Sequence, residues 1–389
     1  MFSSRLPPSL GPNALAVAID RMRSSGAPFI DLTVTNPTSV GLAYPAALLH
    51  ELASEASLTY APEPFGMTSA REAVAGEFAR QRSPVSTNRI VLTASTSEAY
   101  SLLFKLLCNS GDEVLIPQPG YPLFDLLSRL DDVRAVPYRL QEHARWSIDR
   151  ESVERALTPR TRAILVVSPN NPTGSIMSAP DARWLAAICA SREMAIISDE
   201  VFGDYRLQEL TGSSAEKLSA ASAFPACLNF RLGGLSKSAG LPQVKLGWIA
   251  VDGPDAPVAA ALSRLELICD TYLSVSTPVQ VAAASLIEGG AVVRAAILER
   301  IRRNLATLRT LVAGRPDVTL LEPMAGWSAV IQVPATEPEE QLVLGLLTDR
   351  GVLVHPGYFF DFAHEAFLVL SLLPEESAFS DGVTRVLAR

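Results

Sequence analysis

Short runs of branched apolar residues alternate along the chain with longer segments whose apolar residues recur at helical spacing. Such short runs suit strands buried on both faces, and amphipathic segments between them suit helices that cover a sheet. We therefore expect strands near residues 89–92, 113–116, 163–167, 195–198, 227–231 and 246–251, and helices near 69–82, 97–108, 121–130, 181–192 and 256–270. This alternation predicts an α/β fold with a mostly parallel sheet sandwiched by helices.

The pattern changes after about residue 280. A long, arginine-rich helical stretch is followed by strand-like segments at 318–321, 328–334 and 366–373, which predict a smaller α+β domain. The segment before about residue 45 is too short to fold alone, so we expect it to pack on this smaller unit. The predicted division is a large domain of residues 46–280 and a composite small domain of residues 1–45 plus 281–389.

Composition limits the classes of function. The chain has 389 residues and a formal net charge of −8, without a clustered basic stretch, so nucleic acid is not an expected partner. Its longest apolar runs are interrupted by Gln280, Glu288 and Arg294 before they reach the roughly 20 residues that a membrane helix needs. The first residues, MFSSRLPPSLGP, contain no apolar run typical of a secretory signal, and we expect a cytoplasmic protein without a membrane partner.

Cysteine and histidine spacings do not indicate a metal site. The cysteines are far apart and form no C-x-x-C pair, and the histidines show no metal-ligand spacing. The cysteines are Cys108, Cys189, Cys227 and Cys269, and the histidines are His50, His143, His355 and His364. We expect buried thiols and ordinary surface or loop histidines.

Polar segments follow five of the predicted strands, where each strand ends. They are TASTSEAY, PQPGYP, SPNNPTG, DEVFGDY and GGLSKSAGLP. In an open parallel sheet such ends lie at one edge, where ligands bind. The segments offer helix-start amides suited to a phosphate, an aromatic ring, an Asn, an Asp and a Lys. Each has an ordinary interpretation as a turn, a cap or a solvated charge, but together they suit an anionic heteroaromatic aldehyde cofactor.

Three motifs carry a family resemblance. SPNNPTG, SDEVF and LSKSAGLPQVKLGW, in this order and at these distances, resemble the fold type I pyridoxal-phosphate enzymes, specifically the class I/II aminotransferases. PFIDLTVTNPT, YAPEPFGMTSAR and RGVLVHPGYFF extend the resemblance over nearly the whole chain. It implies an enzyme that binds pyridoxal 5'-phosphate and moves an amino group between an amino donor and a keto acid.

The resemblance also implies roles for single residues. Lys237 would form the Schiff base with the cofactor and then act as the base and acid that moves the substrate proton. Asp199 would keep the pyridine nitrogen protonated, so that the ring acts as an electron sink. Asn171 would donate a hydrogen bond to the ring's phenolic oxygen, and Tyr121 would stack on the ring face.

Further family positions concern the phosphate and the neighbouring subunit. Ser95, Thr96 and Ser97 would receive the phosphate at a helix N-terminus, together with Ser236. Lys245 stands where the family usually has an arginine that reaches the same phosphate. Tyr60 matches a residue that reaches the other subunit's cofactor, which implies a homodimer with shared active sites.

Several positions depart from the family. Phe202 stands where most relatives have a tyrosine whose hydroxyl contacts the ring oxygen, and Tyr205 could return a hydroxyl to this place. Gly234 stands where the family often has Ser or Thr. Val369 stands where relatives carry the arginine that binds the substrate's α-carboxylate by a strong bidentate pair.

The missing arginine leaves two interpretations of the substrate. Either another cation binds the carboxylate, with Arg231 and Arg350 as candidates, or the substrate has no standard α-carboxylate. Asn36 and Tyr205 are further candidates for substrate contact. A lyase that uses the same cofactor, or a catalytically weak or non-catalytic paralogue, is the alternative to an aminotransferase.

Overall fold

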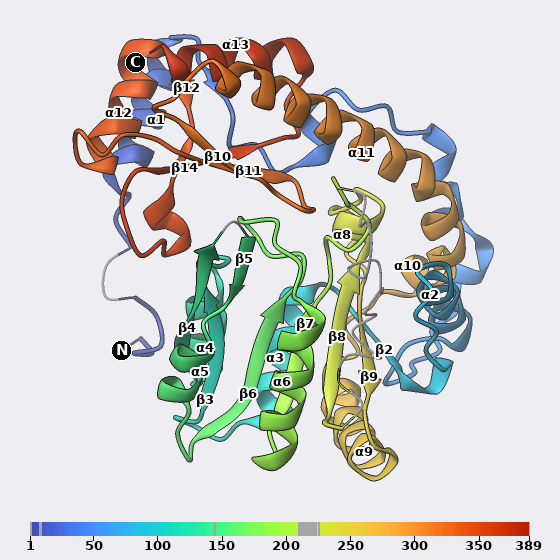
Figure 1. Ribbon diagram of the computed structural model, residues 1–389. Coiled ribbons are helices and arrows are strands. Elements are labelled where there is room, and N and C mark those ends of the chain that lie inside the picture. Colours follow the sequence, from blue (N-terminus) through green and yellow to red (C-terminus); the bar gives the residue numbers. More distant parts are fainter. Residues whose placement is uncertain (1, 8–9, 144, 209–223, 225, 389) are drawn as a thin grey trace.

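The computed structural model describes residues 2–7, 10–143, 145–208, 224 and 226–388. An eight-stranded sheet forms its largest layer (Figure 1). In spatial order the strands are β2 (Ile90–Thr93), β9 (Gly247–Asp252), β8 (Asn229–Gly234), β7 (Ala195–Asp199), β6 (Thr161–Val167), β3 (Glu113–Gln118), β4 (Arg134–His143) and β5 (Arg145–Ile148). The central pairs from β8 to β4 are parallel, whereas β9 and β5 run antiparallel to their neighbours.

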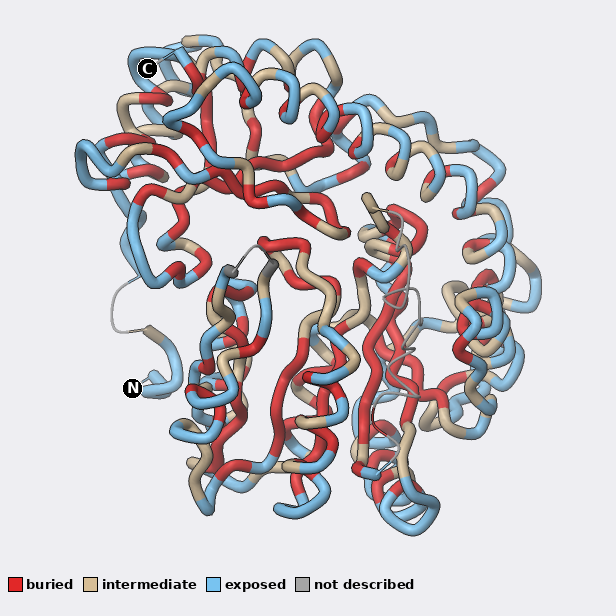
Figure 2. The backbone as a smooth tube through the Cα atoms, viewed as in Figure 1, coloured by how far each residue is buried: buried red, intermediate tan, exposed pale blue. Residues whose placement is uncertain are grey.

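Helices cover both faces of this sheet. One apolar cluster joins one sheet face to α3 (Thr96–Leu107), α4 (Phe124–Leu130) and α9 (Asp255–Tyr272). Another joins the opposite face to α5 (Arg150–Ala156) and α6 (Ala179–Ser191). Figure 2 shows buried residues concentrated along the strands, with exposed residues on the outer helix surfaces. The predicted helix-covered, mostly parallel sheet is thus confirmed.

A second, smaller layer lies at the carboxyl edge of the large sheet (Figure 1). It contains a four-stranded sheet in the order β10 (Thr319–Leu321), β11 (Ser328–Gln332), β14 (Phe367–Ser371), β13 (His355–Pro356), and a two-stranded pair of β1 (Ile30–Asp31) and β12 (Val352–Leu353). The β1–β12 pair joins the N-terminal segment to the C-terminal unit. The domain boundaries at residues 46 and 280, between the large and the composite small domain, stay a prediction.

One long helix connects the two layers. Helix α11 (Ala283–Ala313) contacts α2 (Thr68–Arg80) beside the large sheet and α13 (Glu376–Leu387) in the small layer (Figure 1). Its buried Asn304 donates hydrogen bonds to the carbonyls of Leu372 and Pro374, just after β14. The remaining α-helices of the described residues are α1 (Ala14–Ser25), α8 (Leu235–Ser238), α10 (Thr277–Val281) and α12 (Glu339–Arg350). Within the described part of the chain, every helix is too short or too polar to cross a lipid bilayer.

The sequence pattern missed one part of the large sheet. Strands β4 and β5 and helix α5 were not predicted, although their residues complete one end of the sheet. In β4 only Val136, Tyr138 and Leu140 pack into the core, while Pro137 and Arg139 lie between them. This is the alternation of a half-exposed strand, which a search for continuous apolar runs overlooks.

A glycine turn connects the two layers near the strand ends. The carbonyl oxygen of Gly174 accepts hydrogen bonds from the amides of Met324 and Ala325, at 3.1 and 3.0 Å. Gly174 has φ of +67°, and a Cβ atom there would lie 2.4 Å from the carbonyl oxygen of Ala325. The close approach therefore requires glycine at residue 174.

We predict that Gly174→Ala destabilises the protein more than a matched substitution at Gly41, which has φ of +72° and no neighbouring atom within 4 Å of an added Cβ. Both variants incur the left-handed backbone cost of about 1 kcal/mol, but only Gly174→Ala adds a steric clash, worth about 2 kcal/mol. Denaturant unfolding of both variants measures the difference. Equal losses in the free energy of unfolding would contradict the close contact.

Candidate active site

Four strand ends of the parallel sheet bring polar groups to one edge. Asp199 is the last residue of β7, and the neighbouring strand β8 leads directly into α8, which contains Lys237. Asn171 follows β6, and Tyr121 follows β3. The predicted convergence at the carboxyl edge is therefore present in the structure.

Lys237 lies in an apolar, aromatic environment. Its Nζ atom is 4.8 Å from the ring centre of Trp327 and 5.7 Å from that of Phe202. Burial lowers the pKa of the Lys237 ammonium group, and the negative charge of Asp199 partly opposes this shift. A lysine with a lowered pKa supplies the neutral amine that attacks an aldehyde carbon.

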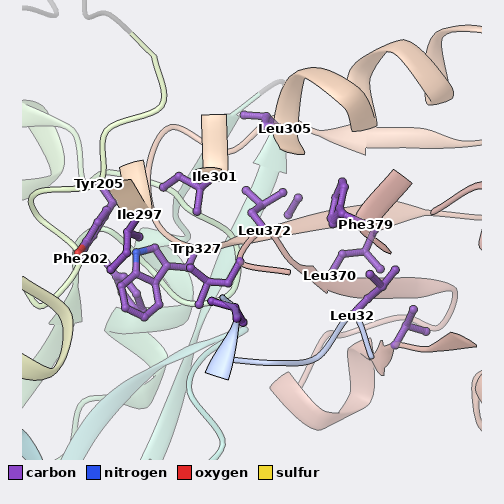
Figure 3. Packing of buried hydrophobic residues seen from close by; sticks show 14 of the residues in the cluster. Leu32, Phe202, Tyr205, Ile297, Ile301, Leu305, Trp327, Leu370, Leu372 and Phe379 are labelled. Atoms are coloured by element: carbon purple, nitrogen blue, oxygen red, sulfur yellow. The ribbon is translucent and has the colours of Figure 1, made fainter. Parts of the chain in front are cut away.

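Three aromatic rings form the wall beside this amine. Trp327 packs edge-on against Phe202, with ring centres 5.4 Å apart, and against Tyr205, at 5.0 Å (Figure 3). The hydroxyl of Tyr205 donates a hydrogen bond to the backbone carbonyl of Lys237. The prediction that Tyr205 returns a hydroxyl to a ring oxygen is thus wrong, because this buried phenol fixes the lysine backbone instead. Trp327 was not among the predicted site residues.

Asp199 is a buried carboxylate with two protein donors. Its Oδ2 atom accepts a hydrogen bond of 2.6 Å from the hydroxyl of Tyr100, and its Oδ1 atom accepts one of 3.1 Å from the amide of Val201. Burial raises the pKa of Asp199, whereas these two donors and Lys237 act to lower it. Tyr100 was also missed by the sequence analysis, although it lies four residues after Thr96 on the same predicted helix.

The N-terminus of α3 carries the predicted phosphate-binding residues. Ser95 is the N-cap and accepts a hydrogen bond from the amide of Glu98, whose carboxylate accepts one from the amide of Ala94. This reciprocal cap leaves the amides of Thr96 and Ser97 without intrahelical acceptors. Such amides at the positive end of a helix suit an anion.

Two glycines explain one departure from the family. Gly234 and Gly247 are paired across β8 and β9. A Cβ atom on Gly234 would lie 3.0 Å from the carbonyl oxygen of Leu246, and one on Gly247 would lie 2.9 Å from Oγ1 of Thr93. A serine or threonine at residue 234 is therefore disfavoured by the close packing of β9. Ser236 is half-buried and Lys245 is exposed, two residues before Gly247.

The remaining cofactor candidates occupy different surroundings. Tyr121 is 39% exposed and packs edge-on against Phe124, with ring centres 5.5 Å apart. Asn171 is half-buried, while its neighbour Asn170 is buried and holds the turn through its bonds to Thr173. Tyr60 is 73% exposed and lines a surface hollow together with Tyr272.

The candidate cations for a substrate carboxylate lie elsewhere. The side chain of Arg231 is only 2% exposed and forms ion pairs with Glu200 at 3.1 Å and Asp252 at 3.5 Å. Arg350 is exposed at the end of α12, where it donates to the carbonyl of Ala388. Arg231 was a wrong candidate, because its charge is already neutralised in the core, whereas a role for Arg350 in binding the carboxylate stays a prediction.

Asn36 has a local role in the structure. Its side-chain oxygen caps the short helix η1 (Pro37–Ser39) by accepting hydrogen bonds from the amide and hydroxyl of Thr38. The backbone just before it binds β14, because the hydroxyl of Ser371 donates to the carbonyl of Val34. The structure therefore places Asn36 near the end of β14, with its amide oxygen already used.

An apolar cluster surrounds Val369. Val369 pairs with Val330 on β11 and with His355 on β13, and its side chain packs with Phe360 and Phe362. The carbonyl oxygen of Phe360 accepts a hydrogen bond from Gly120, the residue before Tyr121. The position where relatives carry an arginine thus belongs to an apolar wall that adjoins the Tyr121 turn.

The lysine and aspartate at adjoining strand ends and the helix N-terminus define an enzyme of the fold type I pyridoxal-phosphate class. Residues 30–377 match the model of the family described as aminotransferase class I and II, so the chain belongs to that family. Its function is that of a pyridoxal-phosphate-dependent aminotransferase, an enzyme that transfers nitrogenous groups.

Individual relatives agree with this assignment. Alanine aminotransferase of Mycobacterium tuberculosis is 27% identical over 94% of this chain and 86% of its own length. Glutamate-pyruvate aminotransferase AlaA of Escherichia coli is 26% identical over 88% of this chain and 85% of its own length. The solved structure of alanine aminotransferase from Pyrococcus furiosus has a TM-score of 0.89 at 21% identity and covers 100% of both chains, which shows the shared fold.

We predict that Asp199→Asn lowers the pKa of Lys237 further in the cofactor-free protein, because it removes the charge that opposes the effect of burial. The midpoint for modification of Lys237 by an acylating reagent should move to lower pH by about one unit. Mass spectrometry of the modified protein reads this midpoint, with Lys105, paired with Asp131 at the surface, as an internal reference. An unchanged or higher midpoint would contradict the proposed electrostatic coupling.

Proposed function

We propose that Lys237 holds the cofactor through its amine and moves the substrate proton at Nζ during amino transfer. The observation that carries this proposal is the buried amine beside Phe202 and Trp327, at the strand end next to Asp199. The aromatic rings lie beside the amine, and burial lowers its pKa, which favours the neutral form that can accept a proton. The bonded carbonyl of Lys237 limits movement of its backbone.

The donor set fits pyridoxal 5'-phosphate. The start of α3, with Ser95, Thr96 and Ser97, offers amides and hydroxyls for a phosphate, and the hydroxyl of Ser236 and the charge of Lys245 lie on the segment that follows β8. Asp199 offers a carboxylate for the ring nitrogen. Bound there, the cofactor would supply a ring that withdraws electrons from the substrate's amino carbon.

The two remaining ring contacts are also proposals. Tyr121 offers an aromatic face beside the sheet edge, and Asn171 offers an amide donor for the phenolic oxygen. Phe202 has no hydroxyl, and the hydroxyl of Tyr205 donates to the backbone carbonyl of Lys237. We therefore propose that Asn171 donates to the phenolic oxygen without a second hydrogen bond from a tyrosine at these two positions.

We also propose that the protein acts as a homodimer with shared active sites. Tyr60 and Tyr272 are exposed aromatic side chains that line one surface hollow, and Leu58 and Leu267 are exposed apolar residues on the same segments. Clustered exposed apolar side chains favour a protein interface. A cytoplasmic location is proposed as well, and the four unpaired cysteines fit a reducing compartment.

We predict that wild-type protein converts its bound cofactor to the pyridoxamine form in a single turnover with at least one member of a panel of amino acids and primary amines. Lys237→Ala should slow this conversion at least about thousandfold, because it removes the amine that lies beside Phe202 and Trp327 and is proposed to move the proton. Absorbance spectra follow the conversion, and Lys105→Arg at the protein surface is the control.

Two results would contradict transamination. Failure of every donor to change the wild-type spectrum would indicate a non-catalytic paralogue. Ammonia release without the pyridoxamine form would indicate a lyase.

We further propose that no guanidinium ion binds the amino donor at the position of Val369, where relatives carry an arginine for the substrate's α-carboxylate. Val369 lies in the apolar wall, the charge of Arg231 is paired with Glu200, and Arg350 donates to the carbonyl of Ala388. The apolar and aromatic side chains that pack with Val369 include Val330, Phe360 and Phe362, and His355 pairs with it on β13. Such a wall is better suited to an uncharged group than to a carboxylate.

We predict that ethylamine and L-alanine differ by less than about tenfold in kcat/KM for the donor half-reaction. A bidentate arginine pair would favour the amino acid by about hundredfold or more. Stopped-flow absorbance with both donors, at equal pH and ionic strength, measures the ratio. A preference for L-alanine above about hundredfold would show that another cation binds the carboxylate.

A further inference from the structure

Tyr100 is a buried tyrosine whose hydroxyl has one specific partner. It lies on the sheet-facing side of α3, is 3% exposed, and donates its 2.6 Å hydrogen bond to Oδ2 of Asp199. The residues are 99 positions apart in sequence. A hydrogen bond to a buried carboxylate is stronger than one between neutral groups, because the acceptor carries a full charge.

Aromatic packing fixes the direction of this hydroxyl. The Tyr100 ring lies edge-on to Phe124, with ring centres 5.4 Å apart, and also contacts Phe104 at 6.2 Å. Phe124 in turn lies edge-on to Tyr121 at 5.5 Å. A continuous row of three rings therefore connects the partner of Asp199 with the residue proposed to stack on the cofactor.

The hydroxyl stays a donor throughout the range in which the carboxylate titrates. Burial raises the pKa of Tyr100 well above its usual value, and the charge of Asp199 raises it further. The same hydrogen bond acts to lower the pKa of Asp199 against the effect of burial. The other groups that influence Asp199 are the Val201 amide and Lys237, which lower its pKa, and Glu200, which raises it.

Helix α3 links two parts of the cofactor site. Its N-terminal residues, Ser95 and Thr96, are the proposed phosphate ligands, and Tyr100 lies four residues after Thr96. Four residues advance a helix by about 6 Å. One rigid helix thus sets the distance between the phosphate-binding amides and the donor that orients Asp199.

We propose that Tyr100 is a positioning residue that keeps Asp199 ionised and oriented for the ring nitrogen of pyridoxal 5'-phosphate. This inference rests on the proposed role of Asp199 as the partner of that nitrogen. Tyr100 does not touch the reacting atoms in this assignment, because it acts only through the carboxylate.

Tyr100→Phe tests the proposal by removing one hydroxyl, and Tyr138→Phe is a matched control. Tyr138 is a buried tyrosine on β4 whose hydroxyl donates to the carbonyl of Leu165 at 2.9 Å. Its ring packs on the face of the large sheet opposite to the face that α3 covers. Both variants lose a buried hydrogen bond, so thermal unfolding of each cofactor-free protein measures how much stability this loss removes, separately from any effect on the cofactor.

The first readout is cofactor affinity, measured by titrating pyridoxal 5'-phosphate into each cofactor-free variant. Tyr100→Phe should weaken binding about tenfold, because a carboxylate that is less firmly ionised and oriented binds the ring nitrogen more weakly. Without that bond the pKa of Asp199 rises, so its carboxylate becomes protonated at a higher pH. On acidification, Tyr100→Phe should therefore lose affinity for the cofactor at a higher pH than wild type does. Tyr138→Phe should leave both the affinity and its pH profile within about twofold of wild type.

The second readout is the donor half-reaction. Tyr100→Phe should lower kcat about tenfold while KM stays within about threefold, because the loss acts on the ring nitrogen rather than on the substrate. Wild-type affinity with an unshifted pH profile in Tyr100→Phe, or equal effects in Tyr138→Phe, would overturn the proposal. If the wild-type protein fails to transfer an amino group, the affinity and pH measurements still decide the role of Tyr100.

Discussion

Two opposite charges at the ends of adjacent parallel strands constrain the rest of this site. Burial disfavours the ionised form of both Asp199 and Lys237, and each charge partly compensates for the other. Such a pair persists only where further hydrogen bonds satisfy its atoms. Tyr100 and the amide of Val201 do this for the carboxylate, and Tyr205 holds the backbone from which the lysine extends.

The two layers contribute unlike surfaces to the site. The large sheet supplies the charges, the amides and the hydroxyls at its strand ends. The small layer supplies Trp327 beside the lysine and the apolar wall around Val369, to which Trp146 of β5 adds its ring, 5.9 Å from Phe362. Polar recognition is thus concentrated on the cofactor side, while the side proposed for the donor is apolar.

The sequence predicted the parts of the molecule that depend on local pattern. Continuous apolar runs located the buried strands, and the order of their polar ends placed Asp199 and Lys237 at one edge. Strand β4 was missed because only alternate residues are buried. The assignments of Tyr205 and Arg231 failed for another reason, since a hydroxyl or a guanidinium ion in a motif gives no information about which distant carbonyl or carboxylate uses it.

Contacts between distant segments account for what the sequence did not reveal. The helical pattern around Tyr100 gives no sign of a role in the site, because its partner Asp199 lies 99 residues further along the chain, at the end of β7. Trp327 likewise follows an ordinary glycine turn, and only the docking of that turn on Gly174 brings it to the lysine. Such residues could have been found by asking which buried polar side chains face the predicted edge.

The paired glycines of β8 and β9 have a consequence for how this protein could change over evolutionary time. A single replacement of Gly234 by serine would push a Cβ atom toward Leu246 and Gly247, and β9 itself lies against Thr93, Ser95 and Thr96 at the start of α3. A serine at residue 234 would therefore require β9 to shift at Leu246 and Gly247. Neither glycine can be replaced without movement of a neighbouring segment, so that related sequences with this packing are expected to carry both glycines together.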